Sequence, residues 1–161
     1  MARTETVTVM FTDLVGSTEL SSRLGHDAYE VLRQQHFAAC RAALAMHHGT
    51  EIKTTGDGLM LCFTSAADAV ACGVAFQQAI SRPGRQAHLV QMRVGISAGE
   101  ATREDNDLYG PPVVGTSLRG RVAWTDLRCR RRTGVVARQR LYLYRRGRSH
   151  VEGAARATSC V

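Results

Sequence analysis

The first hundred residues alternate between short apolar runs and longer stretches with helical periodicity. Continuous or alternating runs of β-branched and apolar residues are typical of strands, and apolar residues at every third or fourth position are typical of helices that cover a sheet. Glycine and polar clusters separate the runs and mark turns. The predicted elements are a strand at Thr6–Phe11, a helix after Thr18 that ends at His47-His48-Gly49, strands at Glu51–Lys53 and Leu59–Phe63, a helix that Thr64 or Ser65 caps and that runs through Ile80 to Arg82-Pro83-Gly84, and a strand at His88–Ser97.

Both predicted helices carry signals at their ends. In the first helix, His47 and His48 place cationic groups in the last turn, and Gly49 suits the left-handed residue that ends many helices. In the second, Ser65 with Asp68 three residues later has the spacing of a capping box. The first helix is expected to pack through a stripe of apolar residues, namely Leu20, Leu24, Ala28, Val31, Ala38, Ala42 and Ala45.

The order strand, helix, strand, strand, helix, strand predicts an α+β fold with a ferredoxin-like βαββαβ core. The turn Thr54–Gly58 joins the two middle strands, and its two glycines are expected to supply the positive φ angles of a tight hairpin. In this topology the third strand inserts between the first two, antiparallel to the first. Asp13, at the end of the first strand, is then expected beside Asp57 in the turn.

Two carboxylates that converge from loops of different strands are suited to hard divalent cations such as Mg²⁺ or Mn²⁺ bound to phosphates. The loop Leu14-Val15-Gly16-Ser17-Thr18 lies between a strand end and a helix start, where free backbone N–H groups favour an anion. The alternative is that Asp13 caps the helix and Asp57 only forms the turn. Either residue alone fits that simpler role, and their joint placement favours the metal site.

Three segments resemble signature motifs of the class III adenylyl and guanylyl cyclases. They are Phe11–Thr18 (FTDLVGST), Lys53–Gly58 (KTTGDG) and Arg93–Glu100 (RVGISAGE), within a resemblance that covers roughly residues 5 to 114. The resemblance implies a catalytic domain that converts ATP to cyclic AMP and pyrophosphate in intracellular signal transduction. It also implies a homodimer, or a heterodimer with another cyclase domain, whose active sites form at the interface.

The resemblance also implies roles for individual residues. Asp13 and Asp57, with the backbone at Leu14, would bind two Mg²⁺ or Mn²⁺ ions, and the loop Leu14–Thr18 would hold the triphosphate. Lys53 resembles the residue that recognises the purine edge. Asp107 matches the position of the acid that accepts a hydrogen bond from the adenine amino group, which favours ATP over GTP.

Two positions depart from the family pattern. The family usually places an asparagine that orients the ribose at position 114 and a charge-stabilising arginine at position 118, where this chain has Val114 and Leu118. Arg119 lies one residue out of register. Because such an arginine contributes on the order of 10³-fold or more in other phosphoryl-transfer enzymes, the activity is expected to be weak or lost. The alternative function is an inactive cyclase-like protein that binds nucleotide or dimerises with an intact cyclase.

Charge divides the chain near Leu118. Residues 1–118 hold nine basic and twelve acidic residues, a net charge of −3, whereas residues 119–161 hold twelve arginines and two acids, a net charge of +10. We therefore expect a partial cyclase domain at 1–118 and an Arg-rich tail at 119–161 that is disordered or non-native. A frameshift near codon 115 would explain such a tail as a remnant of a truncated member. A basic arm that binds nucleic acid is the competing hypothesis, and we do not favour it because the tail's aromatic residues match no RNA-binding motif.

Composition limits the remaining possibilities. No run of 18 apolar residues and no signal-peptide pattern is present, so we expect a soluble cytoplasmic protein that does not enter a membrane. The five cysteines form no CxxC pair, and reduced, mostly buried thiols are expected in place of disulfides or a zinc site.

Overall fold

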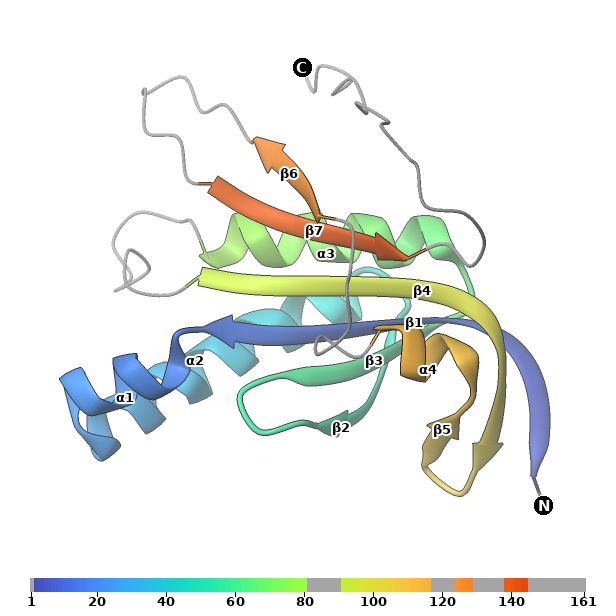
Figure 1. Ribbon diagram of the computed structural model, residues 1–161, viewed down its shortest axis with the longest axis horizontal. Helices are drawn as coiled ribbons and strands as arrows, with labels where there is room; N and C mark the ends of the chain where they lie inside the picture. The colour runs from blue at the N-terminus through green and yellow to red at the C-terminus, as the bar shows by residue number, and fades with distance from the viewer. Residues whose placement is uncertain (1, 81–90, 117–123, 129–137, 145–161) are drawn as a thin grey trace.

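The computed structural model describes residues 2–80, 91–116, 124–128 and 138–144. The described part of the chain folds into a mixed sheet with helices (Figure 1). The strands are β1 (Arg3–Val15), β2 (Thr50–Thr54), β3 (Leu59–Phe63), β4 (Gln91–Glu104), β5 (Asp107–Tyr109), β6 (Trp124–Arg128) and β7 (Arg138–Tyr144). The helices are α1 (Ser17–Leu24), α2 (His26–Ala45), α3 (Ala66–Ile80) and α4 (Pro111–Thr116).

The sheet order is β2-β3-β1-β4-β7-β6, with β5 paired to the far end of β4. Strand β3 lies between β1 and β2 and is antiparallel to both, which confirms the predicted ferredoxin-like core. Strands β1 and β4 form the long antiparallel centre of the sheet, and every residue of β1 has a partner on β4. Both strands run from one end of the described fold to the other. Asp13 therefore lies near one end of this pair, and β5 lies at the opposite end.

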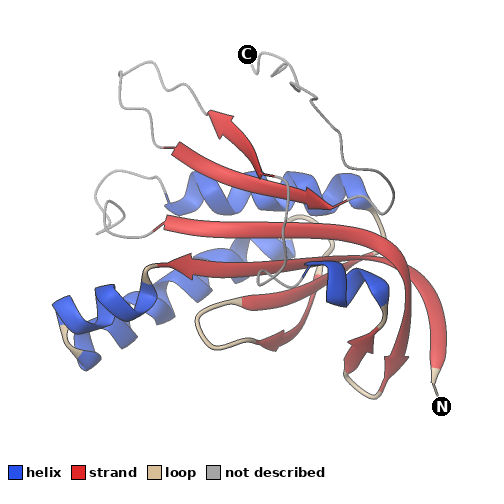
Figure 2. Ribbon diagram, in the orientation of Figure 1, coloured by secondary structure: helices blue, strands red, loops and turns tan. Residues whose placement is uncertain are grey.

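Helices α1, α2 and α3 cover one face of the sheet (Figure 2). Alternate residues of β1 and β4, such as Met10 and Val94, point into this layer and pack against α3 residues such as Phe76, which is fully buried. Each large apolar side chain buried in this way contributes about 1.5–3 kcal/mol. The core on this face therefore fixes the strands whose ends carry the candidate site.

The opposite face carries a smaller apolar cluster beneath β5 and α4. Val7 and Val9 of β1 point to this side and pack with Leu108, while Val113 of α4 covers part of the cluster. Pro112 packs over Gly99, where an added Cβ would lie 3.4 Å from the proline ring. The odd-numbered residues of β1, Asp13 included, therefore point to the face that α1–α3 leave uncovered.

The first helix differs from its prediction. It is two helices that meet at Gly25, whose φ of 82° lets the chain leave α1 and restart as α2. The restart rotates the buried face, so the predicted apolar stripe is wrong beyond Leu24: Val31 is 55% exposed. The residues of α2 that are buried are larger and partly polar, namely Tyr29, Leu32, His36, Phe37, Cys40 and Leu44.

Two predicted glycine roles are also corrected. After α2 the left-handed residue is His48, with φ 54°, whereas Gly49 is required because a Cβ there would lie 2.3 Å from Leu44 and 2.4 Å from Phe63. In the hairpin turn only Gly56 has a positive φ, at 71°. The predicted cap of α3 is confirmed, because the Asp68 backbone N–H donates to the Ser65 Oγ at 3.2 Å.

Beyond residue 116 the structure describes two strands. β7 pairs parallel to β4, and β6 pairs with β7, so both extend the sheet where no regular structure was predicted. The other residues of the predicted tail, the predicted end of the second helix at positions 82–84, and positions 88–90 of the predicted fourth strand lie outside the described residues. The boundary at residue 118 therefore stays a prediction.

Of the five cysteines, the described Cys40, Cys62 and Cys72 are buried free thiols, as predicted. Cys129 and Cys160 lie outside the described residues. Burial raises the pKa of the Cys40 thiol to about 12, which keeps it protonated and unreactive near neutral pH. Among the described helices, none is long and apolar enough to cross a membrane.

Candidate functional site

The hairpin turn that carries Asp57 packs directly on the end of β1 that carries Asp13. The Leu59 backbone N–H donates to the buried Thr12 Oγ1 at 2.9 Å. Gly58 approaches so closely that an added Cβ would lie 1.8 Å from the Thr12 carbonyl oxygen. Asp57 precedes Gly58 and Asp13 follows Thr12, so the two half-buried aspartates belong to one corner of the sheet, as the topology predicts.

A cation from β4 already faces one of these carboxylates. Asp13 and Arg93 are register partners on β1 and β4, and the Arg93 Nη2 donates to the Asp13 carboxylate in an ion pair. The Arg93 Nε is buried and has no hydrogen-bond partner among the described residues. Arg93 lies in a motif that the sequence pointed to, but its contact with Asp13 follows only from the strand register.

The loop between β1 and α1 leaves a helix N-terminus unblocked. Gly16 is the N-cap residue, in the left-handed region with φ 67°, and no side chain caps the helix. The alternative that Asp13 caps this helix is therefore wrong. Leu14 buries its side chain in the core, whereas Val15, Gly16 and Thr18 are exposed, so the loop leaves the positive end of the helix open to solvent.

Helix α2 contacts the turn from the other side. The Arg33 Nη1 donates to the Gly56 carbonyl oxygen at 3.4 Å, and Tyr29 lies one helical turn earlier on the same side of α2. Burial raises the pKa of Tyr29 to about 12, with the neighbouring Asp57 carboxylate adding to the rise and Ser17 opposing it. Sequence reasoning missed both residues, because the contact depends on where α2 crosses the sheet.

The two residues that resemble purine-recognition groups meet at a second corner of the same sheet. The Lys53 Nζ on β2 forms an ion pair with the Asp107 carboxylate at the start of β5. The hydrogen bond from Lys53 holds the pKa of Asp107 below its usual value, and the Leu108 backbone N–H also donates to this carboxylate at 2.8 Å. The side chain of Asp107 is therefore fixed as an ionised acceptor.

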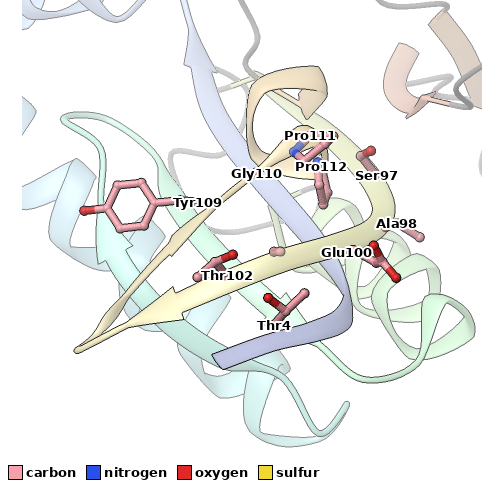
Figure 3. A pocket seen from close by; sticks show the side chains of 11 residues that line it. Thr4, Ser97, Ala98, Glu100, Thr102, Tyr109, Gly110, Pro111 and Pro112 are labelled. Carbon is pink, nitrogen blue, oxygen red and sulfur yellow. The ribbon is translucent and has the colours of Figure 1, made fainter. Parts of the chain in front are cut away.

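A cavity of about 450 Å³ lies elsewhere, between the N-terminal end of β1 and α4 (Figure 3). Thr4, Glu100 and Pro112 line it, and none of the four predicted acidic and basic site residues does. Ser97 also lines the cavity and pairs with Val9, so its near edge lies four strand residues, roughly 13 Å, from Asp13 along β1. The cavity is therefore separate from the Asp13 corner, but it borders β5, because Tyr109 lines it two positions after Asp107.

The donor set at Asp13 and Asp57 fits a cation that completes its shell with substrate and water. Within the described ranges no group of three or more His, Cys, Asp or Glu side chains could hold a metal by itself. Mg²⁺ typically uses only one or two protein carboxylates and takes its other ligands from phosphates and water. Two aspartates, the backbone carbonyl at Leu14 and a bound triphosphate would supply that chemistry.

Comparison with known proteins agrees with this architecture. Residues 1–120 match the adenylate and guanylate cyclase catalytic domain family, so the chain belongs to this family. It is 32% identical over 108 residues to the putative adenylate cyclase 3 of Rhizobium meliloti (strain 1021), a match that covers 65% of this chain. The chain spans only 18% of the length of that relative.

Solved structures show the same fold. The adenylyl cyclase CyaB from P. aeruginosa superposes with a TM-score of 0.65 at 19% identity, and the match covers 91% of this chain and 97% of that chain. A dimeric guanylyl cyclase domain of the RhoGC fusion protein from Blastocladiella emersonii gives a TM-score of 0.63 at 21% identity, over 72% of this chain and 73% of that chain. Adenylyl and guanylyl cyclases therefore share this fold, and the purine must be argued from the site.

Proposed function

We propose that the chain is an adenylyl cyclase domain that binds ATP with two divalent cations and converts it slowly to cyclic AMP and pyrophosphate. The observation that carries the proposal is the arrangement of four charged residues on one sheet. Asp13 and the Asp57 turn lie at one corner, and the Lys53–Asp107 pair lies at another. The family membership supplies the reaction, and these residues supply the metal and purine contacts.

The choice of ATP over GTP rests on the ionised state of Asp107. Its lowered pKa and its hydrogen bonds from Lys53 and Leu108 keep it a pure acceptor. The 6-amino group of adenine donates hydrogen bonds, whereas the 6-oxo group of guanine accepts them. An ionised carboxylate at this position attracts adenine and leaves the guanine oxygen facing an unpaired acceptor.

The corner of the sheet that carries Asp13 and Asp57 acts on the triphosphate. Asp13 and Asp57 hold the cations, and the free N–H groups at the start of α1 bind phosphate oxygens. Cations held by Asp13 and Asp57 would supply positive charge that stabilises the phosphates and the ionised ribose 3′ hydroxyl. That hydroxyl gives its proton to solvent water and attacks the α-phosphorus, the bond from the α-phosphorus to the α,β-bridging oxygen breaks, and pyrophosphate leaves with that oxygen.

We further propose that two copies of the domain, or this chain and another cyclase domain, assemble the site between them. The structural neighbour from B. emersonii is a dimeric cyclase domain. In this chain Asp13 lies on the sheet face that α1–α3 leave uncovered, and Val114 on α4, at the same face, is 76% exposed. A two-fold arrangement would pair Asp13 and Asp57 of one protomer with Lys53 and Asp107 of its partner.

The second candidate function is a cyclase-like protein that binds nucleotide without turnover. It is favoured by Val114 and Leu118, the apolar residues at the positions where the family places the ribose and phosphate contacts. Val114 is described on α4, whereas Leu118 and Arg119 lie outside the described residues. The Asp13–Asp57 corner and the Lys53–Asp107 pair do not depend on these positions. Nucleotide binding is therefore expected even if the chain does not convert the nucleotide.

Equilibrium binding of 3′-deoxy-ATP tests the shared part of both functions, because this nucleotide lacks the attacking hydroxyl. Calorimetric titration with Mn²⁺ is expected to show binding that weakens at least tenfold in Asp57→Asn and is weaker for 3′-deoxy-GTP. Glu51→Gln is the matched control, since it removes a carboxylate on the neighbouring strand β2 from an exposed ion pair with Arg41 of α2. Binding that needs neither Mn²⁺ nor Asp57 would contradict the proposal.

A further inference from the structure

The hydroxyl of Tyr29 is a buried polar group without a hydrogen bond. The residue is only 7% exposed, and its Oη is enclosed with no partner at hydrogen-bonding geometry among the described residues. A buried hydroxyl in this state costs about 1–3 kcal/mol relative to one that is satisfied. Phenylalanine would fill the same space without that cost, so the hydroxyl calls for an explanation.

The surroundings of Tyr29 connect it to both halves of the metal corner. Arg33, one turn further along α2, donates to the Gly56 carbonyl and so fixes the Asp57 turn against this side of the helix. Ser17, the first residue of α1, follows the loop after Asp13. Asp57 and Ser17 are both close enough to influence the ionisation of the phenol. The spacing of one helical turn between Tyr29 and Arg33 therefore places the phenol on the side of α2 that faces the Asp57 turn.

We propose that Tyr29 is a positioning residue of the metal site: its hydroxyl, without a partner among the described residues, donates to the Asp57 carboxylate and accepts from the Ser17 hydroxyl once Asp57 binds a cation. The inference rests on the proposed function, because it concerns how Asp57 is held for its cation. A ligating carboxylate has oxygen lone pairs left over, and a neighbouring donor that occupies one of them fixes the orientation of the other. Tyr29 would thus couple the position of Asp57 to that of the loop at the start of α1.

This role differs from simple packing in what the hydroxyl affects. If Tyr29 only fills the core, its ring carries the effect, and removal of an unsatisfied hydroxyl is neutral or stabilising. If the hydroxyl orients Asp57, its removal weakens cation binding while the metal-free fold is unchanged or more stable. Loss of an outer partner of a metal ligand typically costs 10–100-fold in metal affinity.

The test is Mn²⁺ binding to the full chain, measured from the electron paramagnetic resonance signal of free Mn²⁺, for wild type, Tyr29→Phe, Tyr109→Phe and Asp57→Asn. Tyr109→Phe makes the same chemical change at an exposed phenol on β5. The proposal predicts a Mn²⁺ Kd about tenfold higher in Tyr29→Phe than in Tyr109→Phe. Thermal unfolding of the metal-free proteins is measured in parallel, with no lower Tm expected for Tyr29→Phe.

Three results would overturn the proposal. A Kd in Tyr29→Phe within twofold of the Tyr109→Phe value, beside wild-type binding that Asp57→Asn abolishes, would remove the role of Tyr29 and leave the proposed function standing. A higher Kd accompanied by a lower Tm of the metal-free protein would show that the hydroxyl acts through the fold. Wild-type Mn²⁺ binding that is insensitive to Asp57→Asn would remove the metal site itself, and the inference with it.

Discussion

Lys53 and Asp107 form an ion pair although 54 positions separate them in the chain. Lys53 lies on the edge strand β2, and Asp107 begins β5. Strand β5 pairs antiparallel with the end of β4. The pair places a donor and an ionised acceptor side by side before any purine arrives. Such preorganisation lowers the cost of ordering these side chains when a ligand binds.

Replacement of Asp107 should change the purine preference. In Asp107→Ala the acceptor for the adenine amino group is lost, so the ratio of GTP to ATP Kd is expected to fall about tenfold. Competition binding of the two nucleotides with Mn²⁺ measures this ratio. Glu51→Gln, which breaks the ion pair between Glu51 on β2 and Arg41 on α2, should leave the ratio unchanged. An equal change in both variants would show that only the surface charge matters.

The close approach of the turn to β1 predicts unequal effects of two glycine substitutions. Gly58→Ala would place a Cβ 1.8 Å from the Thr12 carbonyl, and we expect a loss of about 3 kcal/mol in the free energy of unfolding. Gly56→Ala meets no atom within 4 Å and pays only for its positive φ, about 1 kcal/mol. Urea denaturation of both variants checks the difference, and a Gly56 variant as unstable as the Gly58 variant would contradict the packing of the turn.

His36 should make the fold sensitive to mild acid. Burial lowers the pKa of this imidazole from 6.5 to about 4, and its Nδ1 has no partner among the described residues. Between about pH 6.5 and pH 4 the imidazole is therefore protonated in the unfolded chain and neutral in the folded protein. The free energy of unfolding falls as the pH drops through this window, and His36 does not change it above pH 6.5. The full cost is about 3 kcal/mol.

Urea midpoints at pH 7 and pH 4.5 measure this loss, with His36→Leu as the comparison. The leucine variant has no proton to bind at this position and should lose less stability between the two pH values. Equal losses in wild type and His36→Leu would assign the acid sensitivity to other groups.

Restoration of the missing arginine should raise turnover. In Leu118→Arg a guanidinium returns to the position where the family stabilises phosphate charge, and cyclic AMP production is expected to rise on the order of 10³-fold. The Kd for 3′-deoxy-ATP should change much less, because such a cation acts mainly on the transition state. Arg119→Ala is the companion variant: if Arg119 already fills this role, its loss abolishes the activity and Leu118→Arg adds little.

The sequence predicted the core of the fold because local patterns were sufficient there. The bounds of β3 agree with the apolar run Leu59–Phe63, and the Ser65 cap follows from side-chain chemistry. The break at Gly25 was missed because both halves keep helical periodicity across it. Strands β6 and β7 were missed because their residues show no sustained period, and their pairing with β4 is a long-range contact.

The candidate site was predicted only as far as motifs reach. Asp13, Asp57, Lys53 and Asp107 came from local patterns and family resemblance, and the structure gathers them into two corners of one sheet. Arg93, Arg33 and Tyr29 contact those corners through the strand register and the crossing of α2. Contacts of this kind depend on tertiary packing, which no spacing along the chain encodes.

The most direct test of the central claim is cyclic-nucleotide production by the purified chain with Mn²⁺ and either ATP or GTP, beside Asp13→Ala. We predict slow formation of cyclic AMP, faster than cyclic GMP, that Asp13→Ala abolishes and Leu118→Arg accelerates. Equal product from wild type and Asp13→Ala, or no cyclic nucleotide from either wild type or Leu118→Arg, would contradict the assignment of cyclase activity to this site.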